Sequence, residues 1–187
     1  MTRGRVEVRD GFIVLLAALW CADTTNVLPL VLLAAAAHEA GHLLVLHLSG
    51  GRLHRLTLTA CGAVLHCALP PGRCARVAVC LAGPAASFAL TALAASYGWW
   101  RLAGASALLG LFNLLPLPPL DGGMALSHLC AGRFGMLRGL LAGGSAAGLA
   151  LGGIRLWQMG GGIWLLLIGA LICAKTVKNL AKDRAMV

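Results

Sequence analysis

The sequence predicts an all-α integral membrane protein, with about six transmembrane helices and a short β-hairpin between the second and the third. Hydrophobic residues make up 59% of the 187 residues and charged residues only 11%, whereas roughly a quarter of the residues in ordinary soluble domains are charged. A chain of this length has room for about six membrane-length helices with short connections and no separate soluble domain. We therefore expect a single membrane-embedded domain that comprises residues 1–187.

Apolar segments recur along the chain and are the candidate helices. They comprise residues 11–22, 27–48, 75–97, 102–117, 136–154 and 160–174. The first and fourth segments are short for a full span. Asn26 is the expected N-cap of the second helix, Pro29 suits its first turn, and the Ser-Gly-Gly run at 49–51 is expected to end it.

The segment between the second and third helices, residues 51–69, has a different pattern. Leu53, Leu56 and Leu58 partly alternate with polar residues, and Gly62 interrupts the alternation. This pattern favours a short β-hairpin, with a plain cytoplasmic loop as the alternative. A free strand edge in such a hairpin could pair with an extended peptide.

The basic residues predict the topology of the chain in the membrane. With the N-terminus in the cytoplasm, 13 of the 15 Lys and Arg residues lie in cytoplasmic segments, and only Arg101 and Arg155 lie outside, as the positive-inside rule requires. We expect a multi-pass protein of a bacterial-type cell membrane with both termini cytoplasmic. The net charge of +9 does not indicate a nucleic-acid partner, because the basic residues form neither a long stripe nor an aromatic platform.

The seven cysteines do not indicate a disulfide framework, because they are odd in number and mostly lie in or beside apolar segments. Cys61, His66, Cys67 and Cys74 could be imagined as a second metal site. They lack the paired C-x-x-C spacing of a zinc knuckle, so we interpret them as packing and loop residues.

The second apolar segment contains the run H-E-A-G-H at residues 38–42. Residues four apart share one face of a helix, so His38 and His42 can hold one metal ion while Glu39 reaches its bound water. Positive-inside topology places this run toward the cytoplasmic face. The alternative is that these residues pair with neighbouring helices or line a water path without a metal.

A catalytic zinc site of this kind needs a third protein ligand and an open position for water. Asp121 is the acidic candidate that is both near a membrane segment and on the cytoplasmic side. It follows a stretch with three prolines, which rule out a continuous helix, and broken backbone at membrane depth must be buried in protein or line a wet cavity. Asp121 is therefore our candidate third ligand, and a loop aspartate that caps the next helix is the alternative.

The two motifs together resemble the site-2 protease family of intramembrane zinc metalloproteases. Residues 38–42 match its H-E-x-x-H pattern, and residues 113–123, N-L-L-P-L-P-P-L-D-G-G, match its N-x-x-P-x-x-x-L-D-G pattern. The compact layout is similar to the branch that contains the sporulation protease of a sigma-factor precursor. The resemblance covers residues 27–123.

This resemblance implies that His38, His42 and Asp121 hold zinc, that Glu39 is the general base, and that Asn113 lies near the substrate carbonyl or backbone. Residues 83–87, G-P-A-A-S, resemble a further family element in which an Asn commonly stands at the place of Ser87. This departure from the family pattern puts any polar role of Ser87 in doubt.

We therefore expect an intramembrane zinc endopeptidase that hydrolyses a peptide bond of a membrane-associated protein near the cytoplasmic face. A sigma-factor precursor or an anti-sigma-type protein is the expected kind of substrate, with a role in sporulation. Other expected partners are the lipid bilayer and either a regulatory membrane protein or a second copy of the chain. The alternatives are a metal-binding membrane protein without proteolysis, such as a transporter or an inactive scaffold, and a purely structural protein.

Overall fold

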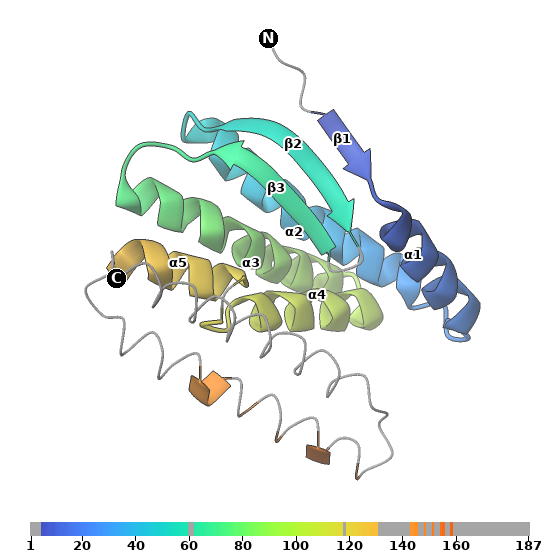
Figure 1. Ribbon diagram of the computed structural model, residues 1–187. Helices are drawn as coiled ribbons and strands as arrows, with labels where there is room; N and C mark the ends of the chain where they lie inside the picture. Colours follow the sequence, from blue (N-terminus) through green and yellow to red (C-terminus); the bar gives the residue numbers. More distant parts are fainter. Residues whose placement is uncertain are drawn as a thin grey trace. The chain divides into compact units, whose positions relative to one another are not determined.

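The computed structural model describes residues 5–59, 62–117 and 119–130, together with isolated positions between 143 and 158. The chain forms two compact units, residues 1–112 and 113–187. In chain order (Figure 1), the elements are β1 (Arg5–Val8), α1 (Asp10–Ala22), α2 (Leu28–Leu48), β2 (Arg52–Thr59), β3 (Gly62–Ala68), α3 (Arg73–Ser96), α4 (Trp100–Asn113) and α5 (Asp121–Cys130).

Two of the described helices, α2 and α3, are long and apolar enough to cross a membrane. They have 21 and 24 residues, or about 32 and 36 Å at 1.5 Å per residue, against a hydrocarbon thickness of about 30 Å. Both confirm the helices predicted from the sequence, and α1 confirms the first, shorter segment. The predicted segments 136–154 and 160–174 lie outside the continuously described residues, so the number of six transmembrane helices stays a prediction.

The predicted hairpin is confirmed and belongs to a three-stranded sheet of order β1-β2-β3. β2 pairs antiparallel with β3, and β1 pairs in parallel with the other side of β2. An ion pair reinforces the β1 pairing, because Arg55 Nη1 lies 3.1 Å from Glu7 Oε2. The sequence pattern does not predict a strand at residues 5–8, so the expected all-α class is corrected to a mostly helical fold with a small sheet.

The start of α2 differs from the sequence prediction. Asn26 adopts a left-handed conformation with φ of 53° and is not the N-cap, which is Val27. Instead, the carboxylate of Asp23 accepts hydrogen bonds from the backbone N–H groups of Val27 at 3.1 Å and Leu28 at 2.7 Å. A carboxylate is a strong acceptor for unpaired N–H groups at a helix start, and Pro29 falls in the first turn as predicted.

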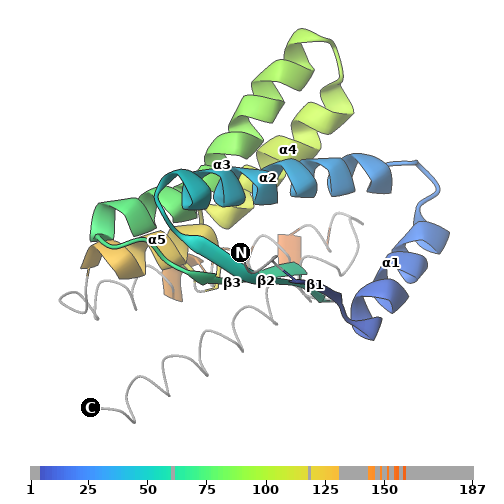
Figure 2. The same ribbon diagram turned by 90° about the horizontal axis from the view of Figure 1, so that it is seen from above.

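Small residues allow α2, α3 and α4 to pack closely (Figure 2). Ala34, Ala94, Leu102 and Ala103 form the buried apolar cluster between these helices. Farther along α2, a Cβ atom added to Gly41 would lie only 2.6 Å from the Cβ of Ala86 on α3. The glycine therefore permits an approach that any side chain would prevent, and it brings residues 38–42 against α3.

The end of α4 and the start of α5 also correct the prediction. The fourth helix ends at Asn113 rather than at residue 117, because Pro116 cannot continue a helix. Residues 121–130, which lie between the predicted segments 102–117 and 136–154, form α5. Asp121 is therefore the first residue of a helix.

The Asp23 cap generates a pH-dependent prediction. Hydrogen bonds to the carboxylate hold the pKa of Asp23 below its ordinary value of 3.8, and the bond from the Leu28 N–H has the largest effect. A group with a lowered folded-state pKa stabilises the fold above its unfolded-state pKa, and this contribution is lost as the pH falls through the folded-state pKa. The difference in Tm between the natural protein and Asp23→Asn should thus stay constant from neutral pH down to about pH 5 and shrink at lower pH. A difference that stays constant well below pH 3.8 would contradict the cap.

Candidate functional site

His38 and His42 project from α2 toward α3 and are almost fully buried, with exposed fractions of 4% and 7%. Their rings meet edge to face, and the two Nε2 atoms are 3.3 Å apart. Glu39 follows His38 on the same helix and is half-buried. The structure thus brings the two predicted histidine ligands together, with the predicted base beside them.

The other nitrogen of each ring is bonded to α3. His42 Nδ1 lies 2.7 Å from the backbone carbonyl oxygen of Val79. A carbonyl oxygen can only accept, so Nδ1 of His42 carries the proton and donates it. Nε2 of the neutral ring then keeps its lone pair, which is the form of histidine that binds a metal.

Ser87 on α3 holds the second ring, since its Oγ lies 2.9 Å from Nδ1 of His38. Ser87 is fully buried. The doubt that the sequence raised about a polar role at this position is therefore resolved, because the hydroxyl bonds directly to a predicted ligand. Both rings turn Nε2 toward the same point.

The spacing of these two nitrogen atoms fits one zinc ion. Zinc binds histidine nitrogen at about 2.0–2.1 Å in tetrahedral sites, which places two such donors about 3.3–3.4 Å apart. The observed 3.3 Å between Nε2 of His38 and Nε2 of His42 agrees with this value. The two imidazoles are therefore arranged as a pair of ligands for a single ion.

Gly83 on α3 provides the space for the two imidazoles. A Cβ atom at this position would lie 2.7 Å from Nε2 of His38 and closer still to Nε2 of His42. Gly83 and Ser87 are four residues apart on α3, as His38 and His42 are on α2. The equal spacing of the two pairs is visible in the sequence, and it could have indicated that residues 83–87 face the histidine pair.

Asn113 and Asp121 lie at the two ends of the proline-rich turn in the second unit. Asn113 ends α4, and Asp121, half-buried, begins α5. Gly122, the second residue of α5, lets the helix start close to this turn, because a Cβ atom there would lie 2.8 Å from the carbonyl oxygen of Leu115. The tight turn fixes the point at which Asp121 enters α5, while the roles of Asp121 and Asn113 stay predictions.

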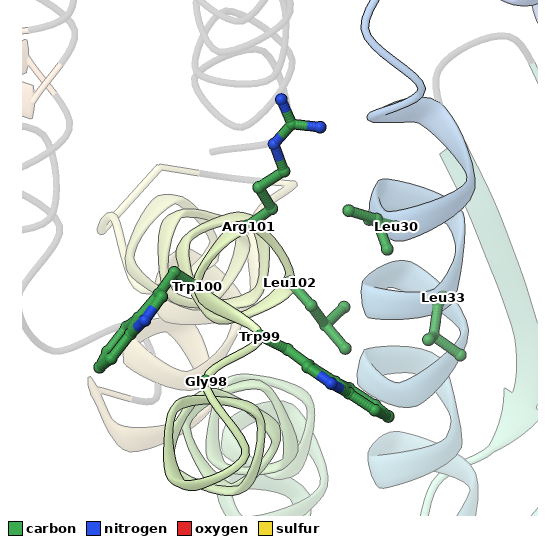
Figure 3. Close-up of a pocket in the computed structure, with 7 residues that line it drawn as sticks. All are labelled: Leu30, Leu33, Gly98, Trp99, Trp100, Arg101 and Leu102. Carbon is green, nitrogen blue, oxygen red and sulfur yellow. The ribbon is translucent and has the colours of Figure 1, made fainter.

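An apolar pocket of about 400 Å³ lies toward the beginning of α2 (Figure 3). Trp99 extends toward Leu30 and Leu33, whereas Arg101 points away from them and donates through Nη1 to the Thr25 carbonyl oxygen at 3.2 Å. The pocket is lined by leucine, tryptophan, glycine and this arginine. It contains no metal ligand or general base, so we assign it no chemistry.

The alternative second metal site has no structural support within the described residues. His66, Cys67 and Cys74 do not form a cluster of potential ligands there, and Cys61 lies outside the described ranges. Burial also raises the pKa of the Cys67 thiol, which disfavours the thiolate that binds a metal.

Replacement of Gly83 by Ala should displace both imidazoles. The added methyl group would overlap them, and overpacking of this kind costs about 1–3 kcal/mol. We expect changed histidine side-chain NMR signals and weaker zinc binding in Gly83→Ala. Gly104→Ala is the matched control, because a Cβ atom at this helical glycine would meet nothing within 4 Å. Equal behaviour of the two variants would contradict the role given to Gly83.

Comparison with known proteins adds a sequence match and a fold match, although no family model matches the chain. Two strains of Mycobacterium tuberculosis, Erdman and H37Rv, have a relative named as a zinc metalloprotease, Rip3, that is 34% identical over 173 residues. The match covers 78% of this chain but only 43% of that relative, so the chain spans less than half the length of the curated relatives it matches.

The fold match is to the solved structure of a site-2 protease from Methanocaldococcus jannaschii. The TM-score is 0.66 at 21% sequence identity, and the match covers 94% of this chain and 90% of that one. At this identity, the structural likeness supports the fold alone. Together with the zinc metalloprotease relative, it agrees with the two sequence motifs, so the chain is similar in fold to a site-2 protease and in sequence to a zinc metalloprotease.

Proposed function

We propose that the chain is a membrane-embedded zinc endopeptidase. The observation that carries this proposal is the pair of Nε2 atoms, 3.3 Å apart, on two buried rings whose Nδ1 atoms are bonded to α3. The name of the relative Rip3 adds support, because it specifies a zinc metalloprotease. The apolar helices α2 and α3 support a location in the membrane.

His38, His42 and Asp121 are the proposed zinc ligands. Asp121 begins α5, and the positive end of a helix dipole stabilises a carboxylate in the first turn. The charges of zinc, Asp121 and ionised Glu39 sum to zero, which lowers the cost of placing them in an apolar surrounding. Two histidines and one carboxylate leave a fourth position for water.

Zinc in such a site lowers the pKa of bound water toward neutrality and polarises a carbonyl group. Glu39 accepts the proton of the attacking water at a carboxylate oxygen and then delivers it to the leaving amine. Val79 keeps His42 in its ligand form through the hydrogen bond to Nδ1. Asn113 binds the substrate carbonyl or backbone, as the family resemblance implies.

The edge of the sheet is the proposed place for an extended substrate. β3 pairs with β2, and β1 occupies the opposite side of β2, so β3 is an edge strand of this described sheet. A peptide bond inside a helix is hidden, and the substrate must unwind before it is cut. Pairing with β3 would hold the unwound segment by backbone hydrogen bonds.

The substrate is proposed to be a membrane-associated protein cut near the cytoplasmic face, where positive-inside topology places residues 38–42. A sigma-factor precursor or an anti-sigma-type protein, a role in sporulation, and a regulatory membrane protein or second copy as partner follow from the resemblance and serve as candidates for testing. The competing function is metal transport or scaffolding without cleavage. Zinc movement across vesicles without peptide cleavage would favour that function.

The role of Glu39 can be tested with the variant Glu39→Gln. The amide keeps the size of the side chain but cannot accept the proton, so we expect zinc to be retained and cleavage to fall by about 100-fold or more. Co-expression with membrane-tethered candidate substrates, with cleavage measured by fragment size, provides the assay. Unchanged proteolysis by the purified variant would rule out Glu39 as the base.

The ligand set can be tested by metal analysis of purified protein. We expect about one zinc per chain in the natural protein, and much less in His38→Ala, His42→Ala and Asp121→Ala. His47→Ala is the control, since His47 lies on the same helix with its side chain exposed. An unchanged zinc content in Asp121→Ala would remove Asp121 from the ligand set.

A further inference from the structure

The two histidines are held by different kinds of hydrogen-bond partner. His42 Nδ1 meets the carbonyl oxygen of Val79, which only accepts. His38 Nδ1 meets the hydroxyl of Ser87 at 2.9 Å, and a hydroxyl can accept or donate by rotating its hydrogen. The Val79 carbonyl oxygen therefore fixes the tautomer of His42, whereas the Ser87 hydroxyl is compatible with either tautomer of His38.

We propose that Ser87 is a positioning residue that supports two tautomers of His38, one without metal and one with metal. Without metal, Ser87 donates to Nδ1 of His38, and Nε2–H of His38 donates to Nε2 of His42. With metal, Ser87 accepts from Nδ1–H of His38, and both Nε2 atoms face the ion. This inference rests on the proposed role of His38 as a zinc ligand.

The change between the two tautomers leaves the charge of the ring unchanged. Water supplies a proton to Nδ1 of His38 and removes the proton from Nε2. The Ser87 hydroxyl turns about its Cβ–Oγ bond, and no heavy atom has to move. A partner that only accepts, such as the Val79 carbonyl oxygen, could not support the metal-free arrangement at His38.

The separation of the two Nε2 atoms suits both arrangements. At 3.3 Å, it is slightly longer than the usual range of about 2.7–3.2 Å for hydrogen bonds, and it also equals the donor spacing of about 3.3–3.4 Å expected around tetrahedral zinc. Two Nε2 lone pairs facing each other would repel unless a proton or a cation lies between them. The ligand pair can therefore keep its position as the ion enters.

Two further hydroxyls hold Ser87 in place through its backbone carbonyl oxygen. Thr91 Oγ1 and Ser106 Oγ each donate to this oxygen at 2.9 Å, and Ser106, on α4, is fully buried. A Cβ atom added to Gly110 of α4 would lie 3.1 Å from the Cβ of Ser87. Close contact with α4 thus fixes the position of the hydroxyl that faces His38.

The test combines zinc affinity with histidine ¹⁵N NMR of the detergent-solubilised full chain, with and without a chelator. In the natural protein, we expect the His38 proton on Nε2 without zinc and on Nδ1 with zinc, while the His42 proton stays on Nδ1 throughout. In Ser87→Ala, zinc affinity should fall by about 10- to 100-fold, and metal-free His38 should no longer show the single Nε2–H form. Ser87→Thr, which keeps the hydroxyl, should restore both properties.

An Nδ1–H form of His38 in the absence of zinc would overturn the proposal, and so would a Ser87→Ala protein with unchanged affinity and tautomers. Circular dichroism and Tm would show whether Ser87→Ala folds. If it does not, the tautomers of the natural protein with and without zinc decide the matter. Full zinc content in His38→Ala would instead refute the proposed function, so the two failures are distinguishable.

Discussion

The close approach of α2 and α3 is the constraint on which the histidine pair depends. Gly41 on α2 and Gly83 on α3 each occupy a point where a Cβ atom would overlap the opposite helix. A glycine within a helix costs about 0.5–1 kcal/mol relative to alanine. Helices in lipid associate through close packing rather than through the hydrophobic effect, so the contact that these glycines permit offsets their cost and also makes room for two imidazoles.

This close contact also lets α3 satisfy the polar groups that α2 buries. An imidazole N–H without a partner in an apolar surrounding costs about 1–3 kcal/mol. Val79 and Ser87 provide the hydrogen-bond partners for the two Nδ1 atoms. They lie on opposite sides of Gly83, four residues before it and four after it. One face of α3 therefore provides both the space for the rings and the groups that orient them.

The sequence predicted what short-range patterns determine. The helices around residues 38–42 and 83–87 follow from apolar segments, and the β2–β3 hairpin follows from the leucine alternation near Gly62. The features that the sequence did not predict depend on partners that local patterns do not specify.

β1 is only 4 residues long and pairs with a strand about 50 positions later. The role of Ser87 likewise depends on His38, which is 49 positions away. The sequence predicts Asn26 as the cap of α2, whereas the carboxylate of Asp23 accepts from Leu28, five positions later.

The support of His38 extends through α3 to α4. Ser106 holds the carbonyl oxygen of Ser87, and seven residues later the same helix ends at Asn113, where the proline-rich turn leading to Asp121 begins. A rigid helix transmits displacement along its axis, and seven residues correspond to about 10 Å. A shift of α4 at Ser106 would therefore act on the residue whose hydroxyl orients His38. Ser106, a buried serine on α4 that is far from the H-E-A-G-H run in sequence, is thus linked to His38 through Ser87.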